Sequence, residues 1–214
     1  MAAFIIVRRE IAGGNELFGA RGTLIRERGG EMTVALQVQQ AQQGDKEALL
    51  QLILAEKDAY YRLAFSYMGN EHDAMDALEE TIVVLYEKIG RLKKPDAFPS
   101  WSRTILANHC KAMLKKRNKV VLIDHWESGN GAHSDAAGVS DPYERRDRRM
   151  DVRSSLERIS PDQKEAIALK YFHDLDYESI ARITNVSVGT AKSRVFNGLK
   201  KLKEWFGGER DGTS

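Results

Sequence analysis

The clearest periodic pattern in the chain lies between residues 176 and 206 and predicts two helices joined by a tight turn. Asp176 is placed to cap the first helix, and Asn185 stands where the turn needs a residue that tolerates the left-handed region. Ser187 is placed to cap the second helix. That helix then carries one apolar stripe, predicted to be buried, at spacings of four, four and three: Ala191, Val195, Leu199 and Leu202.

The rest of the second helix is basic or able to form hydrogen bonds. An apolar back and a basic front at helix-turn-helix spacing are typical of a recognition helix in the DNA major groove; the alternative is a surface helix with a solvated basic face. Early residues such as Arg194 should then meet base edges, and later ones such as Lys201 should meet phosphates. The predicted contacts to duplex DNA are Ser187, Thr190, Lys192, Ser193, Arg194, Asn197, Lys200 and Lys201.

Helical periodicity also runs through the N-terminal half. Apolar positions in residues 45–68 suit one long helix or two short ones, and Gly69-Asn70 predicts a turn that ends it. A further helix, over about 72–89, carries carboxylates opposite its apolar stripe. We expect this acidic face to point away from the core, free to bind a protein partner; a solvated face or a shared divalent cation are the alternatives. Its members are Asp73, Asp76, Glu79 and Glu80.

A loop over Arg91–Pro99 leads into a helix that we expect to begin after a Ser100 cap and to reach about Lys119. An aromatic near its start and cations along it suit unpaired DNA, because bases stack on aromatic rings and phosphates pair with cations. Core packing of Trp101 is the alternative. The predicted contacts to single-stranded DNA are Trp101, Arg103, Asn108, Lys111, Lys115, Lys116 and Arg117.

Composition changes divide the chain into segments. Residues 1–31 are rich in glycine and lack a helical period, so we expect either a disordered arm or a translation start at Met32. Residues 120–150 lose apolar periodicity and predict a flexible linker. Regular structure resumes over 151–207, where Ser160 and Gln163 match a capping box, and 208–214 form a polar tail.

Composition removes several classes of protein. Of 214 residues, 30% are charged but the net charge is only +2, so a surface for nucleic acid must be local. The one cysteine, Cys110, excludes an internal disulfide and is predicted to be a buried thiol. The histidines lack metal-ligand spacing, and no apolar run approaches the ~20 residues of a membrane span. We expect a cytoplasmic protein that is not an enzyme and has no metal or cofactor.

Three of these stretches, in this order and at this spacing, resemble the small extracytoplasmic-function (ECF) group of bacterial RNA polymerase sigma factors. Residues 72–80 resemble region 2.2 of the family, 98–117 resemble regions 2.3 and 2.4, and 177–194 resemble region 4. The resemblance covers about Asp45–Phe206, with a gap at the linker. Departures include Thr184-Asn185, where Leu-Gly is usual, and Val188, where Pro is common.

The resemblance implies an all-α fold of two small helical domains, region 2 over 32–119 and region 4 over 151–207, joined by the flexible linker. The acidic face would bind core RNA polymerase, the helix from Trp101 would melt the minus-10 element, and the helix from Ser187 would read the minus-35 element as duplex. An anti-sigma factor, often membrane-anchored in this group, is an implied partner, and no small-molecule substrate is. A helix-turn-helix regulator that acts without polymerase, or an enzyme using the 73/76/80 carboxylates with a metal, are the alternatives.

Overall fold

The computed structural model describes residues 33–117 and 158–208, and these belong to two compact units, Met1–Arg117 and Asn118–Ser214. Their regular structure is entirely helical, and neither described range contains a strand, which confirms the all-α prediction. The predicted arm (1–31), the predicted linker (120–150) and the tail after residue 208 lie outside the described residues.

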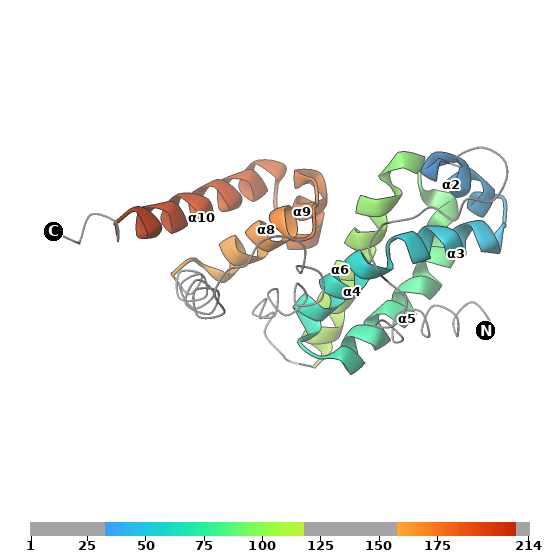
Figure 1. Ribbon diagram of the computed structural model, residues 1–214, viewed down its shortest axis with the longest axis horizontal. Coiled ribbons are helices and arrows are strands. Elements are labelled where there is room, and N and C mark those ends of the chain that lie inside the picture. The colour runs from blue at the N-terminus through green and yellow to red at the C-terminus, as the bar shows by residue number, and fades with distance from the viewer. Residues whose placement is uncertain (1–32, 118–157, 209–214) are drawn as a thin grey trace, which may run out of the picture. The chain divides into compact units, whose positions relative to one another are not determined.

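The first unit is built around three helices that pack pairwise, α4, α5 and α6 (Figure 1). A second pair, α2 and α3, packs together, and α2 also contacts two short 3₁₀ turns, η1 and η2, between α5 and α6. The bounds are α2 Val34–Gln42, α3 Lys46–Ala55, α4 Lys57–Met68, α5 Glu71–Lys88, η1 Ile89–Arg91, η2 Pro95–Ala97 and α6 Phe98–Lys116.

Residues 45–68 form two helices, the second of the two arrangements expected. Asp45 caps α3, because its Oδ1 accepts the Glu47 and Ala48 amides at 2.9 and 3.1 Å. The helix stops at Glu56, and α4 starts at the next residue. Gly69 ends α4 with φ 74°, as the predicted turn requires, and glycine adopts this backbone conformation without a Cβ clash.

The core of the first unit lies between α4, α5 and α6. Most of the residues buried there come from the predicted apolar stripes, and the exception is Phe98, which was predicted to lie in the preceding loop. Each large side chain contributes roughly 1.5–3 kcal/mol when it leaves water. The largest fully buried ones on these helices are Tyr60, Leu63, Leu78, Leu85, Phe98 and Leu106. This packing fixes the relative positions of the acidic helix α5 and the basic helix α6.

Helix α6 begins three residues earlier than predicted, at Phe98, and Ser100 is not its cap. Pro99 lies in the first turn, where its fixed φ suits the helix and the missing N–H costs nothing. The Ser100 hydroxyl instead donates to the Ala97 carbonyl at 3.2 Å. The preceding segment is not a plain loop, since it contains η1 and η2.

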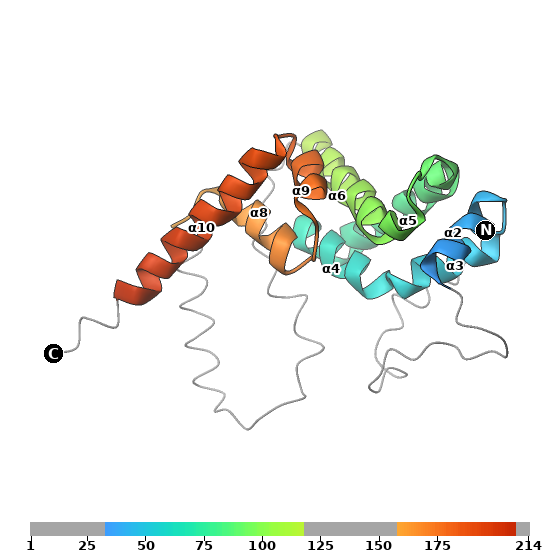
Figure 2. The same ribbon diagram turned by 90° about the horizontal axis from the view of Figure 1, so that it is seen from above.

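The described part of the second unit, residues 158–208, contains three mutually packed helices, α8 Pro161–Tyr171, α9 Tyr177–Thr184 and α10 Val188–Gly208 (Figure 2). The capping box of Ser160 and Gln163 is present at the start of α8. Asp176 caps α9 through the Ser179 amide, at 2.6 Å. Asn185 has φ 54° and ψ 49°, so the left-handed turn between α9 and α10 is also as predicted.

One position of the predicted stripe on α10 is wrong. Ala191 and Val195 are buried, but Leu199 is 36% exposed, and Gly198 is buried in its place. A Cβ at Gly198 would lie 2.7 Å from Ile167 Cδ1, so α8 and α10 approach too closely there for a larger residue. The packed stripe is therefore Ala191, Val195, Gly198 and Leu202, at spacings of four, three and four.

Candidate functional site

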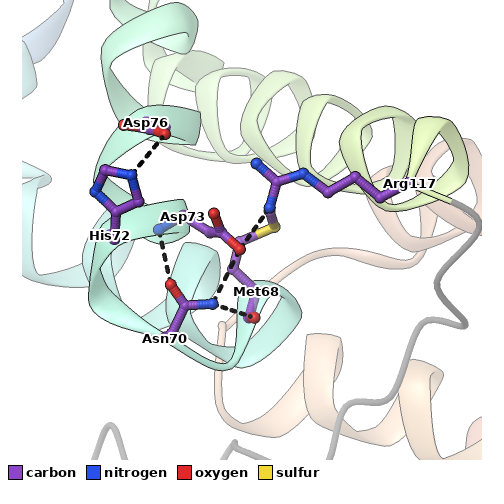
Figure 3. A network of polar contacts seen from close by, with 6 residues as sticks. All are labelled: Met68, Asn70, His72, Asp73, Asp76 and Arg117. Atoms are coloured by element: carbon purple, nitrogen blue, oxygen red, sulfur yellow. Dashed lines mark hydrogen bonds and ion pairs between the residues drawn. The ribbon is translucent and has the colours of Figure 1, made fainter.

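The first carboxylate of the acidic face, Asp73, contacts the end of α6 (Figure 3). Its Oδ2 lies 2.5 Å from Arg117 Nη1 and accepts a hydrogen bond from Asn70 Nδ2 at 3.0 Å. The Asp73 amide in turn donates to Asn70 Oδ1, which caps α5. The acid lies in the first turn of α5 and the cation just after α6, so each complements a helix dipole. The hydrogen bond that Arg117 donates to Asp73 raises the pKa of Arg117 above its ordinary value.

The other carboxylates of this face also lie near side chains of the same unit. Asp76 Oδ2 is 3.7 Å from His72 Nε2, and Glu80 Oε2 is 3.0 Å from His109 Nε2 on α6. Asp73 is only 14% exposed. The acidic face is therefore partly engaged within the unit: Glu80 and, in part, Asp76 are open to solvent, whereas Glu79 is partly buried. In the two described ranges no group of three His, Cys, Asp or Glu could hold a metal ion.

One face of α6 is open along most of its length. Its residues recur at spacings of four, three, four and three, and their exposure increases from the start of the helix. Trp101 is partly exposed, with its ring centroid 6.1 Å from that of buried Phe98, so it both packs and presents a surface. The exposed cations Lys115 and Lys116 lie at the end of the helix. The face consists of Trp101, Ile105, Asn108, Ala112 and Lys115.

Two arginines predicted to bind single-stranded DNA have carboxylate partners inside the unit. Arg103 Nε and Nη2 lie 2.8 and 2.6 Å from Glu56 Oε2, and both side chains are 16% exposed. Arg117 is paired with Asp73. DNA would have to compete with these carboxylates, whereas Asn108, Lys115 and Lys116 are exposed and Lys111 is partly so.

The first turns of α10 also contain partnered residues. Ser187 Oγ accepts the Thr190 amide at 3.1 Å, as the predicted cap. Arg194 Nη2 lies 2.5 Å from Asp162 Oδ2 in the first turn of α8 and is 21% exposed. Lys192 Nζ lies 5.6 Å from the centroid of the Tyr177 ring on α9, a cation–π contact.

The remaining predicted positions of α10 lie at its surface. Thr190, Ser193, Asn197, Lys200 and Lys201 are all exposed, and Lys200 Nζ is 3.8 Å from Glu204. Phe196, which the sequence reasoning did not include, is 68% exposed on the same helix. Its exposure could have been predicted, because Phe196 lies outside the predicted apolar stripe, and an aromatic residue outside that stripe is expected at the surface of the helix.

Cys110 lies on the packed side of α6 and is buried, as predicted. Burial raises the pKa of its thiol to about 12, because the low-dielectric interior disfavours a thiolate. The thiol therefore stays protonated, which is the opposite of what a nucleophilic cysteine needs. No helix in the described parts of the chain is long and apolar enough to span a membrane.

Comparison with known proteins gives consistent matches. Residues 52–120 match the family model described as Sigma-70 region 2, and residues 149–202 match the model described as Sigma-70, region 4. RNA polymerase sigma factor SigV of Bacillus subtilis is 30% identical over 161 residues, covering 75% of this chain and 92% of SigV. ECF RNA polymerase sigma factor SigW of the same bacterium is 23% identical over 81% of this chain and 97% of SigW.

A solved structure shares the fold. CnrH, determined in complex with the cytosolic domain of CnrY, superposes with a TM-score of 0.54 at 19% identity, covering 81% of this chain and 97% of that one. At this identity the likeness concerns the fold alone.

Proposed function

This chain belongs to the ECF group of RNA polymerase sigma factors, and we propose which of its surfaces perform each step in directing core RNA polymerase to a promoter. The main support for the assignment is the order in which the two helical units occur along the chain. A helical unit matching region 2 precedes a helix-turn-helix unit matching region 4, and each presents a distinct polar surface. The chain acts through these binding surfaces.

The outer part of the acidic face binds core polymerase. Asp76 and Glu80 extend from α5 into solvent, and exposed carboxylates steer and orient a basic protein partner. Asp73 and Glu79 are less exposed and border this surface. Asp73 contributes mainly by holding the end of α6 through Arg117, so its replacement would disturb both helices.

The open face of α6 binds the melted minus-10 element. Trp101 offers a ring on which a base can stack, and Asn108 follows it on the same face. Lys115 and Lys116 then meet the phosphates, together with Lys111 at the side of the face. Arg103 contributes indirectly, because its pairing with Glu56 holds α6 in place.

The exposed face of α10 reads the minus-35 element as duplex. A helix that follows a tight turn and packs through small residues can enter the major groove with its opposite side toward the bases. Ser193 and Asn197 lie on that side, and Lys200 and Lys201 follow toward the phosphates. Ser187 and Thr190 form the start of the helix, close to the DNA backbone.

A second protein restrains the chain before it meets polymerase. The fold shared with CnrH supports this, because CnrH was determined in complex with the cytosolic domain of another protein, CnrY. We assign such an anti-sigma factor, anchored in the membrane, as the partner of this chain.

Transcription in vitro tests the assignment. The chain is combined with bacterial core RNA polymerase on a promoter library, and promoter-specific transcripts are expected only when both are present. The paired substitutions Asp76→Arg and Glu80→Arg should weaken binding to core, while stability changes by no more than about 0.5 kcal/mol, as for most surface changes. The matched control is the same charge reversal at an exposed acid of another helix, Asp58→Arg on α4.

A helix-turn-helix regulator that needs no polymerase predicts a different result. It would bind its operator as tightly alone as with core, and the α5 substitutions would have no effect on transcription. Unchanged binding of the double variant to core would remove the α5 assignment alone, because promoter-specific initiation would still identify a sigma factor.

A further inference from the structure

The side of α10 that faces away from the packed stripe is largely uncharged, although the many cations of this helix suggest a basic surface. Gly189, Ser193, Phe196 and Lys200 recur at four, three and four, opposite to the buried Ala191, Val195, Gly198 and Leu202. Asn197 borders this face and is exposed. With the buried stripe packed on α8 and α9, this is the face that a major groove would meet.

The two cations in the first turns of α10 both have partners: Arg194 is turned toward α8, and Lys192 borders the outward face on the side opposite Asn197. Arg194 reaches Asp162 on α8 at 2.5 Å, and its remaining exposure is 21%. Lys192 lies against the Tyr177 ring, with Lys170 at 5.2 Å from the same ring. Arginine or lysine bidentate to guanine is the commonest specific contact in the groove. Neither of these two side chains is placed to make it without first leaving its partner.

The side chains that remain have a different chemistry. An asparagine amide matches the N6 donor and N7 acceptor of adenine in a bidentate pair, which no other base presents in the major groove. Asn197 lies in the third turn, roughly 14 Å along the helix from Val188 at about 1.5 Å per residue. Beside it, the exposed Phe196 can cover a thymine methyl, whose contact with an apolar side chain is also favourable.

We propose that Asn197 is a specificity-determining residue that selects an adenine in the upstream promoter element, and that Arg194 is a positioning residue that holds α10 against α8. This inference rests on the proposed function, since it assumes that α10 enters the groove of promoter DNA. It reverses the sequence-based expectation that Arg194 reads a base. The Arg194–Asp162 pair sets the angle at which Asn197 meets the base edges.

The test uses the full chain with core RNA polymerase and a duplex promoter library randomised over the upstream element. The parent chain should enrich adenine at one position. Asn197→Ala should reduce the preference for adenine there about tenfold, since a good bidentate pair discriminates by roughly 1–3 kcal/mol. Asn197→Arg should move the preference at that position toward guanine. Lys201→Ala is the matched control and should weaken all sequences alike.

The two assignments can fail separately. If the parent enriches no sequence at all, the proposed function is wrong. If it enriches promoters whose preferences are the same in Asn197→Ala, the inference about Asn197 is wrong and the function stands. Arg194→Ala should lower the melting temperature of the second unit and weaken all promoter variants by one factor. Loss of preference at a single base pair in Arg194→Ala would show that Arg194 reads that base and would overturn its positioning role.

Discussion

Replacing Arg103 by alanine should destabilise the first unit more than it weakens DNA binding. The guanidinium places two nitrogens within 2.8 Å of Glu56 Oε2, and each side chain is 16% exposed. Exposed ion pairs contribute about 0–1 kcal/mol, while removing one partner of a fully buried pair costs about 3–5 kcal/mol. For this mostly buried pair we expect a loss of about 2 kcal/mol, or roughly 10 °C in the melting temperature of a unit this size.

A double-mutant cycle isolates the pair. Arg103→Ala, Glu56→Gln and the double variant are unfolded thermally as full-length chains, and hydrogen exchange at α6 amides assigns the change to the first unit. We expect a coupling energy of about 1–2 kcal/mol between the two positions. The reasoning is refuted if Arg103→Ala leaves the melting temperature unchanged and lowers affinity for a pre-melted promoter fragment, because Arg103 would then bind DNA directly.

Three further changes test other parts of the structure. Lys115→Ala and Lys116→Ala should reduce the salt dependence of binding to a single-stranded fragment by about 0.7 in slope for each lost phosphate contact, measured by titration at several salt concentrations. Gly198→Val should cost about 2 kcal/mol in thermal unfolding, because its Cβ meets Ile167 Cδ1 at 2.7 Å, whereas Gly189→Ala, 3.7 Å from Ser187 Oγ, should not destabilise. Burial raises the pKa of Cys110, so the folded chain favours the neutral thiol. The stability that the buried thiol contributes should persist below pH 9.0 and be lost as the pH rises toward about 12, as measured by unfolding at several pH values. The thiol of the native chain should also resist alkylation at pH 8.

Much of the local structure could be predicted from the sequence, because it depends on neighbouring residues. The cap at Asp176, the capping box at Ser160 and the left-handed turn at Asn185 each involve groups within four positions along the chain. Helix periodicity likewise placed the cores of α4, α5 and α6. The start of α6 was misplaced because Ser100 and Pro99 offered competing signals, and proline in the first turn prevailed.

The spacing of α8 and α10 could not be predicted. Leu199 continues the apolar period as well as Gly198 does, and a leucine is the usual choice for a buried position. Only the close approach of Ile167 from α8 decides that the buried residue must have no side chain.

The arginines show why the binding surfaces could not be identified without knowledge of the fold. Arg103, Arg117 and Arg194 were all predicted to bind DNA, and in the structure each also meets a carboxylate far away in the sequence. Two of these pairs join residues 47 and 32 positions apart, so no short-range pattern could reveal them.

The three carboxylates nevertheless share one property that is readable in the sequence. Glu56 immediately precedes α4, and Asp73 and Asp162 lie in the first turns of α5 and α8. An acid there is stabilised by the helix dipole and is already partly ordered, so pairing with a neighbouring arginine costs less side-chain entropy than for an acid in mid-helix. Acids at predicted helix starts should therefore be treated as candidate anchors for arginines elsewhere in the chain. In this chain the three carboxylates pair with arginines, and the exposed lysines Lys115 and Lys116 of α6 and Lys201 of α10 are the cations that can meet phosphate.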